Sequence, residues 1–97
     1  MRVYFAAEVG ALASLRAGDA VRLPAFVPAS EDELDEFDAL ADAAEQGDVV
    51  IAADVDDPRE PFMLDQVAAL HLDADGSGDL AWYAPQELDQ VVELMQG

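Results

Sequence analysis

The chain lacks cysteine, lysine, asparagine and threonine, and it has a single histidine among its 97 residues. Without cysteine there is no disulfide framework, no thiolate zinc site and no thiol nucleophile. Without lysine there is neither a Schiff base nor a P-loop lysine. Because so much catalytic chemistry is missing, we expect a protein that is not an enzyme and has no cofactor.

Basic residues are also scarce, since 22 acids stand against four arginines and give a formal net charge of −18. The arginines are scattered, at Arg2, Arg16, Arg22 and Arg59. Nucleic acids and anionic membranes are bound through basic patches, so we expect the chain to bind neither directly. No apolar run reaches the roughly 18 residues of a membrane span, and Glu8 interrupts the N-terminal apolar stretch. These features predict a cytoplasmic protein.

The apolar segments predict an α+β fold in a single small globular domain, residues 1–97, because strand-like and helix-like patterns alternate along the chain. The expected strands are residues 3–6, 49–55, 67–72 and 80–84, with an edge strand or irregular extended segment at 20–27, where Pro24 cannot donate to a ladder. Helical spacing predicts helices at 9–17, 30–46 and 85–96. Helices between strands imply a crossover, so we expect a mixed β-sheet of four to five short strands with about three helices packed on it.

The helix expected at 30–46 has the strongest pattern. Ser30 and Glu33 fit a capping box, in which each side chain satisfies the other residue's backbone N–H. An apolar stripe follows, which we expect to face the core: Leu34, Phe37, Leu40, Ala41 and Ala44. The outer face carries acids with no basic residue among them, at Glu31, Asp32, Asp35, Glu36, Asp38, Asp42 and Glu45. Packing of the stripe must outweigh the repulsion between these acids.

Residues 73–80, DADGSGDL, resemble the start of a helix–loop–helix calcium-binding loop. Candidate metal ligands are Asp73, Asp75, Ser77 and Asp79. Position 12 of that loop should be a bidentate Glu but is Ala84, and the segment before the loop has the pattern of a strand. Glycines among aspartates are also typical of a chain reversal. We therefore predict a hairpin-like turn, with a cation site as the alternative.

Other chemistry-bearing residues have a structural interpretation as well as a functional one. His71 could pair with Asp73, but no serine lies in a nucleophile-elbow context, so a half-exposed structural histidine is favoured over a catalytic one. The acids of residues 54–60 form a second cluster at a strand end, as expected by chance in so acidic a chain. The aromatic residues Tyr4, Trp82 and Tyr83 fit a small core as well as they fit a ligand platform.

Four segments together resemble an uncharacterised family of short acidic actinobacterial proteins of unknown function. They are MRVY, EDELDEFDALADAA, VVIAADV and VAALHLD, in the family's order and over most of the chain. The chain departs from the family pattern after its first strand, where a Thr or Pro is missing. The resemblance implies an intracellular actinobacterial protein whose acidity reflects its proteome, and it implies no activity.

Two classes of function remain. The first is a small non-catalytic acidic intracellular module that binds a basic protein partner through its acidic helix, with a DNA mimic as a special case. The second is a Ca²⁺- or Mg²⁺-dependent binding protein or enzyme that uses the acidic clusters at 54–57 and 73–79. The second class predicts that these clusters converge, together with His71, in the folded protein. The residues do not predict an oligomeric state.

Overall fold

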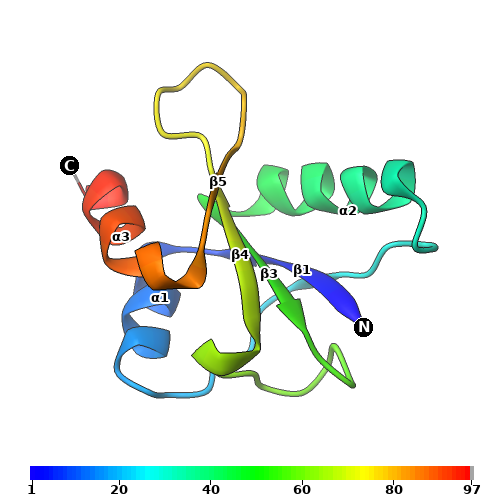
Figure 1. Ribbon diagram of the computed structural model, residues 1–97, viewed down its shortest axis with the longest axis horizontal. Coiled ribbons are helices and arrows are strands. Elements are labelled where there is room, and N and C mark those ends of the chain that lie inside the picture. Colours follow the sequence, from blue (N-terminus) through cyan, green and yellow to red (C-terminus); the bar gives the residue numbers. More distant parts are fainter. Residues whose placement is uncertain (97) are drawn as a thin grey trace.

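The computed structural model describes residues 1–96, which form one sheet of five strands in the order β2-β1-β3-β4-β5 (Figure 1). The strands are β1 (Arg2–Ala7), β2 (Ala25–Phe26), β3 (Val49–Asp54), β4 (Val67–Leu72) and β5 (Ala81–Tyr83). The α-helices of this part of the chain are α1 (Val9–Arg16), α2 (Glu33–Gln46) and α3 (Leu88–Gln96). Single 3₁₀ turns, Leu64–Gln66 and Pro85–Glu87, precede β4 and α3. The predicted α+β fold is confirmed.

The sheet is antiparallel at every pairing, so the expectation of a mixed sheet is wrong in this respect. The expected crossover is nevertheless present. Strands β2 and β3 both pair antiparallel with β1 and therefore run in the same direction, and α2 connects them. Because β1 lies between the two strands, the crossover creates no parallel pair. Sequence order alone does not reveal such an inserted strand.

The segment 20–27 forms an edge of the sheet, as predicted. Only Ala25 and Phe26 pair with β1, and Val21 forms an isolated bridge with Phe62. The carbonyl of Pro24 accepts a hydrogen bond from the Ala6 N–H at 3.1 Å. Proline lacks an N–H to donate, and at the sheet edge none is needed.

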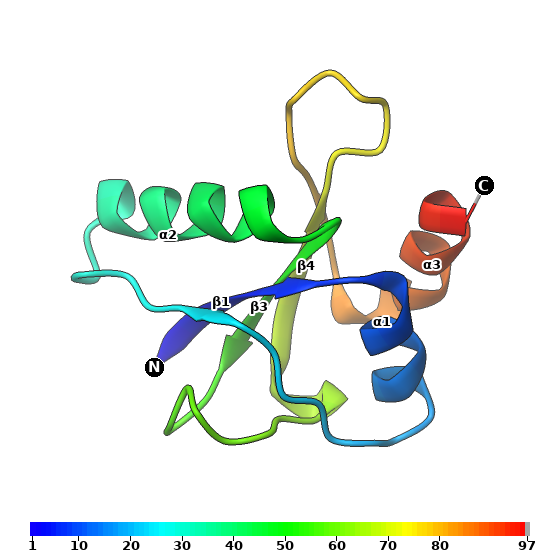
Figure 2. The same ribbon diagram turned by 180° about the vertical axis from the view of Figure 1, so that it is seen from behind.

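One face of the sheet is covered by two helices, α1 and α3, which also pack on each other (Figure 2). This face holds the main core, in which the Phe5 and Phe62 rings lie with their centroids 4.4 Å apart. Its buried side chains are mostly large and aliphatic, and they include Val3, Leu12, Leu15, Ile51, Leu70, Leu88, Val91 and Val92. The predicted apolar spacings of the first and last helices are therefore confirmed.

The other face is covered by α2 alone, which packs on β1, β2 and β3. Its buried residues are Ala39 and Ala43, one turn apart, whereas Leu34 is 73% exposed and Phe37 is 64% exposed. The expected inward stripe is thus wrong at Leu34 and Phe37, whereas Leu40 and Ala44 are partly buried against the core of this face. The buried direction lies about two fifths of a turn away from the centre of that stripe, given 3.6 residues per turn. Two alanines let the helix lie close to the sheet, and this proximity leaves no room for the larger side chains beneath it.

Both ends of α2 depend on particular residues. The cap is Asp32, whose carboxylate accepts the Leu34 N–H at 2.8 Å, so the predicted capping box of Ser30 and Glu33 is wrong. Ser30 instead accepts the Asp32 N–H and donates to the Asp35 carboxylate. At the other end, a Cβ on Gly47 would lie 2.6 Å from the backbone nitrogen of Ala7. The glycine is required there by close packing, because its φ of −143° suits any residue.

Candidate functional site

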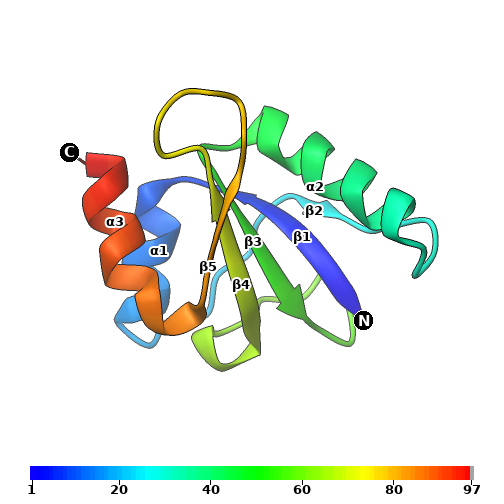
Figure 3. The same ribbon diagram turned by 45° about the horizontal axis from the view of Figure 1, so that its top comes forward.

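Residues 73–80 connect β4 to β5, so the predicted chain reversal is confirmed. The Asp73 carboxylate organises this loop, because it accepts the N–H of Gly76 and the N–H of Gly78, each at 2.9 Å. Both glycines have positive φ values, 77° and 93°, which glycine adopts without steric cost. Figure 3 shows the loop rising between α3 and the C-terminal end of α2.

The other candidate ligands of this loop also bond within it. Asp75 accepts the Ser77 N–H at 3.0 Å, and Ser77 Oγ accepts the Asp79 N–H at 3.3 Å. Hydrogen bonds from Ser77 hold the pKa of Asp75 below its ordinary value. Within residues 1–96, no group of three or more His, Asp or Glu side chains is placed to hold a metal ion. The loop geometry therefore follows from its own hydrogen bonds.

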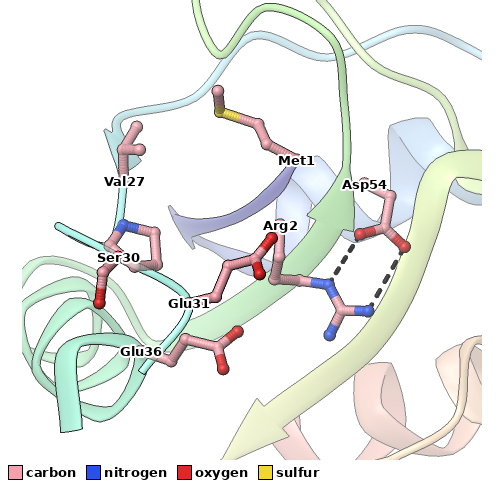
Figure 4. Close-up of a pocket in the computed structure, with 8 residues that line it drawn as sticks. Met1, Arg2, Val27, Ser30, Glu31, Glu36 and Asp54 are labelled. Carbon is pink, nitrogen blue, oxygen red and sulfur yellow. Dashed lines mark hydrogen bonds and ion pairs between the residues drawn. The ribbon is translucent and has the colours of Figure 1, made fainter. Parts of the chain in front are cut away.

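The acids of residues 54–57 lie at the opposite end of the sheet. Asp54 ends β3 and Asp73 follows β4, and these strands are antiparallel neighbours, so the two clusters are separated by the length of a strand. The expectation that the two acidic clusters converge, as a metal-dependent protein would require, is therefore wrong. Asp54 instead pairs with Arg2, at 2.9 and 3.4 Å, and this guanidinium lowers the pKa of the carboxyl group (Figure 4).

A cavity of about 540 Å³ lies beside this ion pair. Its lining combines Arg2 and Asp54 with the chain from Val27 to Glu31 and with Glu36 of α2 (Figure 4). The arginine is the only cationic side chain among these residues, and Asp54 already engages it. The cavity therefore offers an anion no cationic side chain that is free of a carboxylate partner.

His71 lies on the sheet face that α2 covers, with its ring centroid 6.4 Å from that of Tyr4. It is partly buried, and burial lowers its pKa. Asp73 hydrogen-bonds the loop backbone, so the suggested His71–Asp73 pair is not observed among the hydrogen bonds of residues 1–96. Trp82 and Tyr83 are consecutive in β5 and point to opposite faces, so the three aromatic residues do not form one platform.

The two flanks of α2 differ in chemistry. The flank beside β2 carries Asp35, Asp38 and Asp42, which border the segment from Ala25 to Ala29. The flank beside the β4–β5 hairpin is apolar, and it lines a groove of about 670 Å³. The groove residues are Phe37, Leu40, Ala41 and Ala44 on the helix, and Asp73, Gly78, Asp79 and Leu80 on the loop. We refer to these eight residues as the hairpin groove.

Of the ion-paired arginines, Arg2 shares a cavity with an acid of α2, Glu36, but Asp54 already engages it. Arg2, Arg16 and Arg59 pair with Asp54, Asp89 and Asp57 respectively, all outside α2. Within residues 1–96, no salt bridge involves an acid of α2. The helix therefore presents uncompensated negative charge next to exposed apolar side chains.

The hairpin groove was missed at the sequence level. Helical spacing predicts that the groove residues of α2 face the core, because spacing shows which residues share a helix face without showing what that face contacts. The sequence carries no signal that separates the two cases, because the burial of Ala39 and Ala43 is seen only in the structure.

Comparison of the chain with protein families, curated proteins and solved structures finds no match of any of the three kinds. The resemblance to an actinobacterial family therefore stays a prediction. Among the helices of residues 1–96, none has both the length and the apolarity to cross a membrane. The geometry around α2 is accordingly the basis for a functional proposal.

Proposed function

We propose that the protein is a non-catalytic cytoplasmic module that binds a basic segment of a partner protein through α2. The observation that carries this proposal is the pairing of two features on one helix. Its acids have no salt-bridge partner within residues 1–96, and its Leu34 and Phe37 are largely exposed. Charge without compensation and exposed apolar surface are both typical of an interaction site.

The mechanism begins with electrostatic steering. A net charge of −18 on 97 residues raises the local concentration of cationic partners and repels anionic ones. Contacts between arginine or lysine side chains and the α2 carboxylates then orient the partner. Because these carboxylates are solvent-exposed, added salt screens them and weakens the complex.

The test measures binding of a fluorescently labelled arginine-rich peptide by polarisation at low salt. The triple variant Asp38→Asn/Asp42→Asn/Glu45→Gln removes three charges from α2. A matched variant, Asp56→Asn/Glu60→Gln/Asp65→Asn, removes three exposed charges elsewhere, so the two variants have the same net charge. We expect the α2 variant to bind roughly tenfold more weakly than the matched variant.

Equal loss of affinity in the two variants would show that net charge alone attracts the peptide, and the proposal would fail. Affinity that does not change with salt would also contradict it. A labelled peptide of alternating glycine and serine serves as the uncharged control.

A further inference from the structure

The sheet face beneath α2 is only partly covered. The helix packs on β1, β2 and β3 and helps to bury Ala69 of β4, which leaves His71 of β4 and Trp82 of β5 at the less covered side of the same face. His71 and Trp82 are cross-strand partners there, and so they point to the same side of the sheet. His71 is half-buried beside Tyr4, and Trp82 is 60% exposed.

The less covered part consists of β5 and of β4 around His71, beside the flank of α2. The opposite face of the sheet carries two helices side by side, α1 and α3 (Figure 3). The face with α2 therefore lacks one helix relative to its counterpart.

The hairpin groove borders this less covered area with apolar side chains. Phe37, Leu40, Ala41 and Ala44 recur at helical spacing along α2, and Leu80 lies across from them. Leu34, one turn before Phe37, extends the same flank. A helix lying beside α2 would bury these side chains together with Trp82, as neighbouring helices do at axial separations of about 8–10 Å.

Charge decides which helix fits. The groove residues include the carboxylates Asp73 and Asp79 and no basic side chain. A second copy of the chain would bring the same excess of acids to the interface, and like charges face to face oppose association. Every helix of residues 1–96 already has its place in the fold. Charge complementarity therefore favours a basic helix supplied by a partner protein.

We propose that the partly covered area around His71 and Trp82, together with the hairpin groove, binds one amphipathic basic helix of a partner protein, whose apolar side contacts Phe37 and Trp82. The inference rests on the proposed function and deepens it, because it specifies the secondary structure of the partner segment. Recognition then follows the helix-in-groove mode, with apolar anchors at helical spacing and a basic outer side.

The test uses two synthetic lysine–leucine peptides of identical composition, each with the 14-residue length of α2. In the first peptide the leucines fall on one helical face, and in the second they are distributed around the helix. Binding is followed by polarisation of labelled peptide, by the fluorescence of Trp82, which is the only tryptophan, and by peptide helicity in circular dichroism. We expect the amphipathic peptide to bind roughly tenfold more tightly, to gain helicity and to shift Trp82 emission to the blue.

Two variants locate the binding site. Phe37→Ser removes an exposed anchor of the groove, and Leu94→Ser removes an exposed apolar side chain of α3. Phe37→Ser should reduce the affinity of the amphipathic peptide to that of the redistributed peptide, and Leu94→Ser should leave it unchanged. Both positions are exposed, so the folded state survives either change.

The outcomes separate this inference from the proposed function. If both peptides bind equally and Phe37→Ser has no effect, the groove inference fails while basic-segment binding stands. If neither peptide binds at low salt, both proposals fail. If sedimentation shows a dimer that Phe37→Ser dissociates, the occupant is a second copy and the inference is overturned.

Discussion

The two faces of the sheet bury side chains of different sizes. The face under α1 and α3 contains large aliphatic and aromatic side chains that fill a continuous core. The face under α2 contains Tyr4 and Val50, and its other buried members are the alanines Ala39, Ala43, Ala52 and Ala69. The first face uses its large residues for stability, whereas α2 turns two of its largest residues outward.

The difference shows how one small sheet serves two purposes. Burial of about 25 cal/mol per Å² of apolar surface makes the α1–α3 face the main source of stability. The α2 face contributes less, because alanine buries little area. The large residues left exposed on α2 add little to folding and are available for binding. Mutation of a large residue on the α1–α3 face should therefore lower stability, whereas mutation of a large exposed residue on α2 should affect binding and leave stability nearly unchanged.

The largest expected effect is in the main core. Phe62→Ala removes a fully buried ring that packs against Phe5, so we expect the free energy of unfolding to fall by about 3–5 kcal/mol. Phe37→Ala removes an exposed ring and should change it by less than about 0.5 kcal/mol. Urea denaturation of both variants measures the difference. Similar losses in the two variants would mean that Phe37 belongs to the core after all.

The next effect concerns the close approach of α2. Ala43→Leu places extra methylenes between the helix and the sheet, where Ala43 is fully buried, and should destabilise the fold by about 1–3 kcal/mol. Ala41→Leu adds the same atoms on the groove flank, where space is open, and should have a much smaller effect. Thermal denaturation monitored by circular dichroism compares the two. If Ala41→Leu were less stable than Ala43→Leu, the open groove would not lie on the flank of Ala41.

Salt should have a smaller effect, and it acts mainly on the α2 side. Pairs such as Asp38 and Asp42 repel each other by about a few tenths of a kcal/mol each. Monovalent salt screens this repulsion, so the melting temperature should rise from low to moderate salt. Asp42→Asn should raise the melting temperature at low salt and show a weaker dependence on salt. A melting temperature that stays flat or falls with added salt contradicts this prediction.

The smallest effect is the titration of His71. Because burial lowers its pKa in the folded state, the unfolded chain binds the proton more readily. The stabilising contribution is complete above the ordinary histidine pKa of about 6.5 and is lost as the pH falls through the lower folded-state value. The difference in unfolding free energy between the wild type and His71→Gln should therefore decrease between pH 8 and pH 5. A difference that is constant over this range contradicts it.

The element order was predictable because its signals are local. Pro24 indicated an edge, the glycines after Asp73 indicated a chain reversal, and the β-branched run at 49–51 indicated a central strand. Each signal depends on the conformations that a residue and its near neighbours can adopt. These signals can therefore be read from the sequence without knowledge of the tertiary structure.

The candidate site was not predictable in the same way. Leu34 and Phe37 satisfy helical spacing whether a sheet, a partner or solvent lies beside them, so spacing alone assigned them to the core. The acids at 54 and 73 both follow strands, but their separation depends on β3 and β4 being antiparallel neighbours. Strand order and helix rotation arise from packing between distant segments, which one sequence does not display.

The two ends of α2 are held by different kinds of contact. Contact with the backbone of Ala7 anchors the helix where it enters β3, whereas at its first turn Asp32 bonds to the Leu34 N–H and Ser30 bonds to Asp32 and Asp35. A Cβ at position 47 would meet the Ala7 backbone, so the C-terminal end of α2 lies as close to β1 as the backbone allows. The absence of a side chain at Gly47 therefore determines how closely this helix end approaches the sheet.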